Sequence, residues 1–325
     1  MTPMKNKKNL NFAFFGTSRF SVLVLDELEK AGLKPILIVA TPDRQRGRGM
    51  ELQPTPVKGW AQKRGIEIHS PEKLDAIFAE TLSNRTHSNQ MHSNQTHQNH
   101  SHADFSKDAG QKDIDVFVVV SYGKIIPKSI IDLPLHKTLN VHASLLPKYR
   151  GASPLQSAML DDAKDTGISI IRLDEKMDHG PIIAVKEVTV NEWPTYEDFE
   201  AQMAHEGGLL LAQALPEWVA GKIKEREQDH SQATFAKKIT KEDGLIDAAD
   251  LNSNVPTDRA YTAFRKIQAY HQWPTAYFFV ERNSKKMRVK ITKASFKDDK
   301  LTIERIVPEG SKEMDYGDFL KGLRS

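Results

Sequence analysis

The sequence predicts an α/β protein with a mostly parallel sheet and a second, small β-rich domain. Over roughly the first 220 residues, short apolar segments alternate with amphipathic helical patterns, an order typical of parallel strands joined by right-handed helical crossovers. One segment, DVFVVV at 115–120, has no polar alternation, as expected of a strand covered on both faces. From about residue 234, polar connectors and short alternating segments replace this pattern, which indicates a separate domain. We therefore expect a Rossmann-like sheet in the first domain.

The individual elements follow from their patterns and their ends. NFAFFG at 11–16 and KPILIVA at 34–40 read as buried strands on either side of a helix that ends at Gly32. A second helix at 56–65 has Pro56 in its first turn and Gly65 at its end. In the rest of the first domain we expect strands at 115–120, from 138, at 167–173 and at 181–190, and a long helix at 195–222. In the second domain we expect a helix at 257–270 and strands at 275–280, 287–296 and 301–307.

The change in pattern suggests the domain boundaries. We expect a first domain at 1–220, a linker at 221–245 and a second domain at 246–325. The first domain contains a polar His/Asn/Gln-rich stretch at about 84–113, which includes the repeat THSNQMHSNQTHQNH. Its histidines at 87, 92 and 97 are five residues apart, a spacing that gathers them on no single helix or strand face. We therefore expect a disordered insertion, with metal binding as the less favoured alternative.

Composition excludes several classes of protein. The chain has no cysteine, so disulfides and thiolate chemistry are excluded. The basic N-terminus lacks the apolar region of a signal peptide, and no apolar run approaches the roughly 18–20 residues of a membrane span. A cytoplasmic protein is expected. The net charge of +3 is small, but residues 281–300 hold eight Lys/Arg and only three Asp/Glu. This run is either an ordinary solvated face or a surface that contacts phosphates.

Three side chains suggest acyl transfer between nitrogens. Asn140 and His142 are two positions apart in an expected strand, so they point to the same face. Asp178 lies in an Asp-His-Gly-Pro turn between two expected strands. A neutral amide and an imidazolium can stabilise a developing oxyanion, and a carboxylate can favour the imidazolium and assist proton transfer. Each residue also has a structural interpretation, as a strand-end polar group or as a turn former.

Several segments together resemble the folate-dependent formyltransferase family. They are NVHASLLPKYRG at 140–151, TGISIIRLDEKMDHGPI at 166–182, FAFFGTSRFSVLVLDEL at 12–28, VVVSYGKIIP at 118–127 and ATFAKKITKEDGLID at 233–247. Two further segments are similar to the branch of the family that formylates methionyl initiator tRNA. They are TPDRQRGRGMELQPTPVKGWA at 41–61 and VPEGSKEMDYGDFLKG at 307–322.

The resemblance implies an activity and a folate site. The co-substrate would be 10-formyltetrahydrofolate, the acceptor the α-amino group of methionyl initiator tRNA, and no metal would take part. Asn140 and His142 would hold the oxyanion, while Asp178 would orient His142 and assist proton transfer. The resemblance also assigns folate-contacting positions, which are Ser144, Leu145, Leu146 and Pro147, with backbone at Val120, Ser121 and Tyr122 lining the pterin pocket.

The same resemblance implies a tRNA-binding surface, and we expect the enzyme to be a monomer. The second domain would be an OB-like β-barrel, apparently shortened between VKITKAS and IVPEG. Glycines between the arginines of 41–61 would let that loop order on contact with RNA, where planar guanidinium groups bind phosphates or stack on bases. The cations expected to contact tRNA are Arg44, Arg46 and Arg48 in the loop, and Arg282, Lys285, Lys286, Arg288, Lys290 and Lys293 in the second domain.

The same residues are also compatible with other functions. A formyltransferase acting on a sugar amine or on glycinamide ribonucleotide would use the same three residues, and a hydrolase would replace the amine with water. A non-catalytic RNA-binding or metal-binding protein on the same scaffold is the alternative from a different class. The arginine-containing loop and the basic second domain favour the tRNA substrate.

Overall fold

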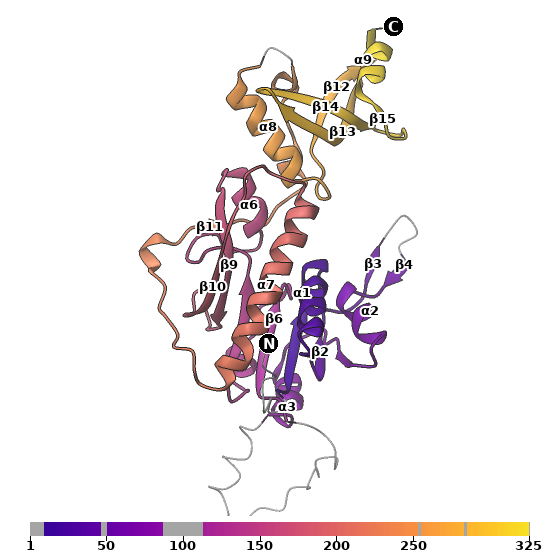
Figure 1. Cartoon of the computed structure of the whole chain (residues 1–325). Helices are drawn as coiled ribbons and strands as arrows, with labels where there is room; N and C mark the ends of the chain where they lie inside the picture. Colours follow the sequence, from indigo (N-terminus) through magenta and orange to yellow (C-terminus); the bar gives the residue numbers. More distant parts are fainter. Residues whose placement is uncertain (1–9, 47–50, 87–112, 253–254, 283–284, 325) are drawn as a thin grey trace, which may run out of the picture. The chain divides into compact units, whose positions relative to one another are not determined.

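The computed structural model describes residues 10–46, 51–86, 113–252, 255–282 and 285–324 (Figure 1). The chain divides into two compact units, each made of several segments. The first unit comprises Met1–Lys148, Gly167–Lys186 and Met203–Ala233. The second comprises Tyr149–Thr166, Glu187–Gln202 and Thr234–Ser325. The predicted histidine-rich insertion lies almost entirely in 87–112, outside the described residues.

A seven-stranded sheet organises the first two-thirds of the chain. Its order is β10-β9-β7-β6-β1-β2-β5. The strands are β1 (Phe12–Gly16), β2 (Leu37–Val39), β5 (Glu67–His69), β6 (Val116–Val120), β7 (Thr138–His142), β9 (Asp165–Arg172) and β10 (Ile182–Thr189). The pairs β1–β2, β1–β6, β2–β5 and β6–β7 are parallel, and β7–β9 is antiparallel. The prediction of a mostly parallel, Rossmann-like sheet is confirmed.

The strand order places a topological switch point between β1 and β6. From β1 the chain proceeds outward to β2 and β5, then returns to the other side of β1 as β6 and continues to β7. Strands β1, β6 and β7 each have five residues, and all of these residues are buried. In open α/β sheets, ligands bind beyond the carboxyl ends of the strands at such a point. Residues that follow Gly16, Val120 and His142 are therefore in position to form a site.

Side chains cap the starts of three helices in the first two-thirds of the chain. The helices are α1 (Arg19–Lys30), α2 (Pro56–Gln62), α3 (Ala76–Ser83), α5 (Lys128–Ile131), α6 (Pro154–Leu160) and α7 (Tyr196–Val219). Ser18, Thr55 and Asp75 accept hydrogen bonds from backbone N–H groups in the first turns of α1, α2 and α3. A Cβ at Gly208 of α7 would lie 2.5 Å from Cβ of Glu27 in α1. Glycine is therefore required where these two helices approach each other.

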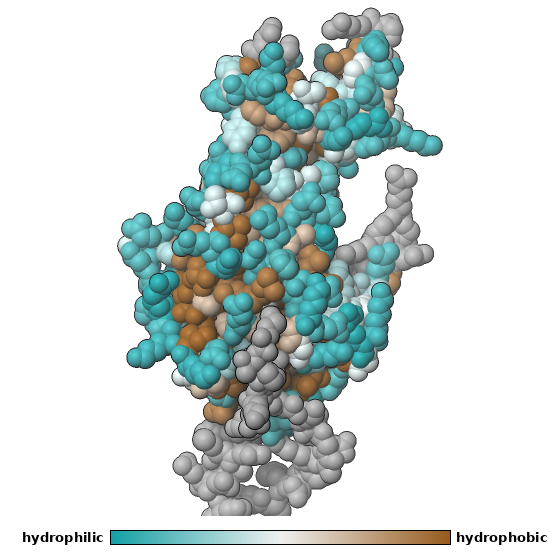
Figure 2. Space-filling model, viewed as in Figure 1, coloured by the Kyte–Doolittle hydropathy of each residue, from teal (hydrophilic) through white to brown (hydrophobic). Residues whose placement is uncertain are grey.

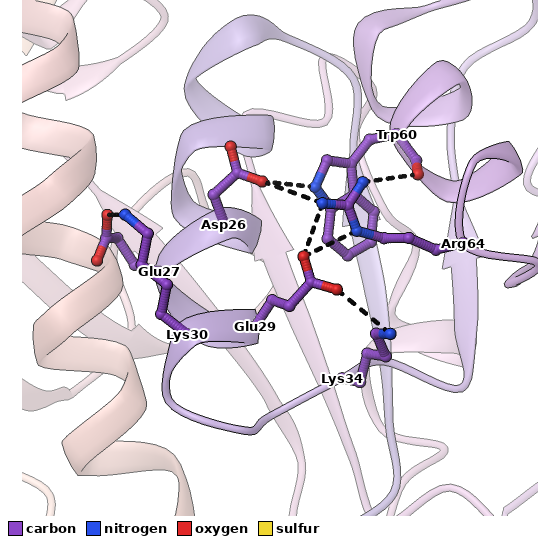
Figure 3. Close-up of polar contacts among 7 residues, drawn as sticks. All are labelled: Asp26, Glu27, Glu29, Lys30, Lys34, Trp60 and Arg64. Carbon is purple, nitrogen blue, oxygen red and sulfur yellow. Dashed lines mark hydrogen bonds and ion pairs between the residues drawn. The ribbon is translucent and has the colours of Figure 1, made fainter.

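The predicted arginine loop forms a short antiparallel ribbon of β3 (Arg44–Arg46) and β4 (Glu51–Gln53). At the root of the ribbon, Nζ of Lys58 in α2 lies 2.7 Å from Oδ2 of Asp43, and both side chains are about three-quarters buried. Polar contacts also hold α2 to α1 (Figure 3). Trp60 Nε1 donates to Asp26 at 2.7 Å, and Arg64 donates twice to Glu29 at 2.9 and 2.6 Å. The ribbon therefore starts from a firmly attached base.

A second sheet and two helices form most of the C-terminal region. The elements are α8 (Thr257–Ala269), β12 (Tyr277–Arg282), β13 (Lys285–Lys297), β14 (Lys300–Pro308), β15 (Met314–Asp315) and α9 (Tyr316–Arg324). The sheet is antiparallel, in the order β12-β13-β14-β15. Asp298 and Asp299, both with positive φ, make the two-residue turn between β13 and β14. The prediction of a small β-rich second domain is confirmed, and the side of this region visible in Figure 2 is mostly hydrophilic.

Asp162 is a polar centre of the second unit. Its Oδ1 accepts hydrogen bonds from Trp193 Nε1 at 2.6 Å and Tyr261 Oη at 3.1 Å, and Lys164 Nζ lies 3.5 Å away. Burial raises the pKa of this carboxyl, but these donors and the nearby cations Lys164 and Arg265 outweigh burial, so its pKa lies below the ordinary value. The ionised carboxylate thereby joins three separate segments of this unit.

Short elements complete the described chain. These are β8 (Arg150–Gly151) and β11 (Phe235–Ala236), which pair in parallel, and the 3₁₀ turns η1 (His230–Gln232), η2 (Glu242–Gly244) and η3 (Ala248–Leu251). No helix among the described residues is long and apolar enough to cross a bilayer.

Candidate active site

Strand β7 presents Asn140 and His142 on one face, with Val141 pointing the other way between them. Both residues are buried, with 9% and 5% of their surface exposed. Oδ1 of Asp178 lies 3.4 Å from Nδ2 of Asn140 and 3.6 Å from Nδ1 of His142. The structure thus gathers the three predicted residues around a single carboxylate oxygen, in the first unit of the chain.

The backbone around Asp178 is held in an unusual conformation. Asp178 has a φ of +48°, in the left-handed region. A Cβ at Gly180 would collide with the carbonyl oxygen of Arg172, so this position accepts only glycine. The buried Gln228 donates from Nε2 to the carbonyl oxygens of Asp178 at 2.9 Å and of Gly180 at 2.7 Å. Gln228 lies in a polar connector with no periodic pattern, so the sequence carries no signal of this contact.

In the segment at 144–147, predicted to contact folate, two residues are buried and two are half-buried. Ser144 is fully buried, and its Oγ donates to the carbonyl of Lys148 at 2.5 Å. The Oγ of Ser169 donates to the Ser144 carbonyl at 2.7 Å and accepts from Leu146 N at 3.0 Å. The sequence pattern did not predict this role for Ser169. The Leu146 side chain packs in an apolar cluster. Leu145 and Pro147 remain half-buried and available to a ligand.

The segment at 120–122, predicted to line the pterin pocket, follows β6 at the switch point. The Val120 carbonyl accepts from Ser21 Oγ at 2.6 Å, and the Tyr122 carbonyl accepts from Thr17 Oγ1 at 2.8 Å. Ser121 is exposed and has a φ of +46°. Tyr122 packs in the core, and burial raises its pKa to about 12. Its phenol therefore stays neutral at physiological pH, and Ser121 is the one exposed residue of the segment, where a ligand can make contact.

The arrangement suits the transfer of a one-carbon acyl group. An amide N–H and an imidazole can donate to a developing oxyanion, and the adjacent carboxylate can accept a proton. Leu145 and Pro147 are half-buried and Ser121 is exposed, so each of these three residues leaves surface that a ligand can contact. The described residues contain no group of three or more His, Asp or Glu side chains that could hold a metal ion.

The predicted tRNA-contacting cations lie in two places. Arg44 and Arg46 belong to β3, whereas Arg48 lies outside the described residues. In the second unit, Arg282, Lys285, Lys286, Arg288 and Lys293 are exposed and Lys290 is half-buried. A shallow depression of about 460 Å³ is lined by Arg282, Lys285, Lys286, Met287 and Glu309.

Two aromatic residues interleave with the cations on one face of the C-terminal sheet. In the register of β12 and β13, Phe279 pairs with Arg288 and Tyr277 with Lys290. Lys286 Nζ lies 4.2 Å from the Phe279 ring centroid, and Arg288 Cζ lies 5.6 Å from that of Tyr277. Val289 and Ile291 occupy the opposite, buried face. The cations are visible in the sequence as a basic run, whereas only the strand pairing brings the two aromatic residues beside them.

Comparison with known proteins identifies the family of this chain. Residues 8–215 match the family model described as formyl transferase, and the chain belongs to the formyl transferase family. Two similar relatives are methionyl-tRNA formyltransferases. That of Sulfurihydrogenibium sp. is 35% identical over 266 residues, 81% of this chain and 74% of the relative. That of Halorhodospira halophila is 30% identical over 96% of both chains.

A solved structure supports the fold. Methionyl-tRNA formyltransferase from Clostridium thermocellum superposes with a TM-score of 0.52 at 15% sequence identity, covering 94% of this chain and 99% of that chain. At this identity the similarity bears on the fold alone.

Proposed function

We propose that this chain transfers the formyl group of 10-formyltetrahydrofolate to the α-amino group of methionyl initiator tRNA. The observation that carries the chemistry is the single carboxylate oxygen of Asp178, 3.4 Å from the Asn140 amide and 3.6 Å from the His142 ring. The tRNA substrate is supported by relatives named methionyl-tRNA formyltransferase, one of which aligns over 96% of both chains.

The three side chains divide the work of the reaction. A bond forms between the methionine nitrogen and the formyl carbon, the bond from that carbon to N10 of folate breaks, and the formyl oxygen gains negative charge in between. Nδ2 of Asn140 and the His142 ring donate to this oxygen. Asp178, with Oδ1 3.6 Å from Nδ1 of His142, orients the ring and takes up the proton that leaves the amine, directly or through water. The same proton is then delivered to N10 as the bond from the formyl carbon to N10 breaks, which releases neutral tetrahydrofolate.

The proposed folate site combines two segments of the first unit. The co-substrate supplies the activated formyl group. The backbone at Val120, Ser121 and Tyr122 would meet the polar edge of the pterin. Residues 144–147 would supply the apolar wall through Leu145 and Pro147, while Ser144 and Leu146 shape the turn that carries them.

Two separate surfaces are proposed to contact tRNA. They are the β3–β4 ribbon in the first unit and, in the second unit, the face of the C-terminal sheet that carries Tyr277 and Phe279. Arg44, Arg46 and Arg48 would act at the ribbon, and the cations of 282–293 would contact phosphates without reading sequence. The partly exposed rings of Tyr277 and Phe279 add surfaces on which an unpaired base can stack. We also propose the sequence-derived division into a catalytic domain at 1–220, a linker at 221–245 and a tRNA-binding domain at 246–325, in a monomeric cytoplasmic enzyme.

The decisive experiment uses the purified full-length chain with 10-formyltetrahydrofolate. Initiator and elongator methionyl-tRNA are offered in parallel, together with an amino sugar nucleotide and glycinamide ribonucleotide. We expect formylation of the initiator and at least tenfold slower formylation of the elongator. Transfer confined to a small amine would replace the tRNA assignment with another formyltransferase activity. Release of formate without transfer would indicate a hydrolase, and size-exclusion chromatography tests the monomer.

A further inference from the structure

Gln228 makes two hydrogen bonds on either side of the turn that carries Asp178. The residue is buried, with 6% of its surface exposed, and Nε2 lies 2.9 Å from the Asp178 carbonyl oxygen and 2.7 Å from that of Gly180. A primary amide nitrogen has two N–H groups, so one nitrogen can satisfy both carbonyls. No other side-chain type of this length carries two donors on a neutral nitrogen.

The backbone that carries Gln228 is itself fixed to the sheet. Arg226 and Ile182 exchange two backbone hydrogen bonds at 2.7 and 2.9 Å, which joins the segment to the start of β10. Further along, the His230 ring stacks on His179, the residue after Asp178, with centroids 4.0 Å apart. His179 is also held by Asp174, through Nδ1 and Oδ2 at 2.7 Å. Gln228 therefore acts from a rigid support, between two other anchors of the same turn.

We propose that Gln228 is a positioning residue for Asp178, which keeps the carboxylate directed at Asn140 and His142. The inference rests on the proposed function, because it assigns Gln228 a role through Asp178 and gives it no contact with substrate. The physical basis is the backbone of Asp178, whose φ of +48° is a conformation that L-residues adopt at a cost. Without the two hydrogen bonds the peptide units around Asp178 can relax, and Oδ1 then leaves its shared position between the amide and the imidazole.

The prediction is a loss of turnover without a loss of binding. Gln228→Leu removes both donors, and Gln228→Glu places a carboxylate of the same shape against two carbonyl oxygens. We expect kcat to fall by about 10–100-fold in both variants, the range that follows from displacing a reacting group by about 1 Å. KM for formyl-folate and for tRNA should stay within about threefold of wild type, since the substrate-contacting groups remain. A variant that merely loosened the fold would raise both KM values or reduce the active fraction.

The matched control is Gln232→Glu, the same chemical change four residues away at an exposed position. It should leave kcat within twofold of wild type. Active fraction is measured by folate-analogue titration, and folding by circular dichroism. If Gln228→Leu does not fold, Gln228→Glu carries the same test.

Asp178→Asn separates the two levels of the proposal. An inactive wild type would overturn the proposed function itself. Full activity in Asp178→Asn would remove the role of Asp178 and with it that of Gln228. An inactive Asp178→Asn combined with folded Gln228 variants whose kcat stays within twofold of wild type would overturn the positioning role alone.

Discussion

Asn140 offers the sharpest test of the proposed chemistry. Asn140→Ala removes one donor to the developing oxyanion and adds no charge. Loss of a single such donor costs about 10²–10³ in kcat, or about 3–4 kcal/mol of transition-state stabilisation. Because the amide is proposed to act mainly in the transition state, we expect KM for both substrates to change by less than about threefold.

Asn140→Asp has the same shape but the opposite electrostatic effect. The introduced carboxylate would lie about 3.4 Å from Oδ1 of Asp178, where the Asn140 amide now lies. Two like charges at this separation repel by about 5 kcal/mol at an effective dielectric constant of about 20. We therefore expect Asn140→Asp to lose at least as much kcat as Asn140→Ala. Its urea midpoint of unfolding should also be lower than that of Asn140→Ala.

The assay is initial-rate formylation of initiator methionyl-tRNA, with urea unfolding measured on the same preparations. The control is Asn191→Asp, which adds the same charge at an exposed turn and should change neither quantity. If Asn140→Ala keeps kcat within threefold of wild type while folded, the amide is not an oxyanion donor and the proposed mechanism is wrong in its central step.

The remaining predictions concern the ribbon, the second unit and the insertion. Lys58→Met breaks the ion pair with Asp43 that holds the root of the ribbon. Because the ribbon is proposed to contact tRNA, we expect KM for tRNA to rise several-fold while folate affinity stays unchanged. A KM for tRNA equal to that of wild type would refute this. Arg288→Met should weaken binding of any tRNA and reduce the salt dependence of log K by about one; an unchanged slope in filter binding would exclude a phosphate contact. Asp162→Ala should lower the free energy of unfolding by about 2–4 kcal/mol. Because the pKa of this carboxyl is depressed, its contribution should be complete above about pH 4 and decline as pH falls further; identical acid unfolding of wild type and variant would contradict it. Removing 87–112 should leave kcat within twofold, since Thr86 and Ile114 already form a bridge; a large loss would revive a metal role for the histidines.

Much of the scaffold could be predicted because its signals are local. The uninterrupted apolar run at 115–120 becomes β6, buried along its whole length. Pro56 and the capping Thr55 start α2 where the sequence indicates. The sheet is parallel as far as β7, but β9 runs antiparallel to it. No local pattern signals that reversal, because strand direction depends on how the chain returns to the sheet.

The candidate site was predictable only in part, for a related reason. Asn140 and His142 share a face because any extended strand alternates its side chains. The roles of Gln228 and Ser169 could not be predicted, because each side chain donates to backbone carbonyl groups that only folding brings close to it. The predicted folate segment also mixes two kinds of residue. Ser144 makes hydrogen bonds within the turn and Leu146 packs in the core. The sequence cannot distinguish these two residues from their half-buried neighbours.

The sequence by itself determined the alternation of strands and helices, the pairing of Asn140 with His142 on one face, and the concentration of cations at 281–300. These properties depend on neighbours a few residues away, and so they can be read along the chain. Only the tertiary structure decided that Asp178, 36 residues beyond His142, reaches both side chains. It also decided that Gln228 holds that turn, because hydrogen bonds between distant segments form only where the fold makes them neighbours.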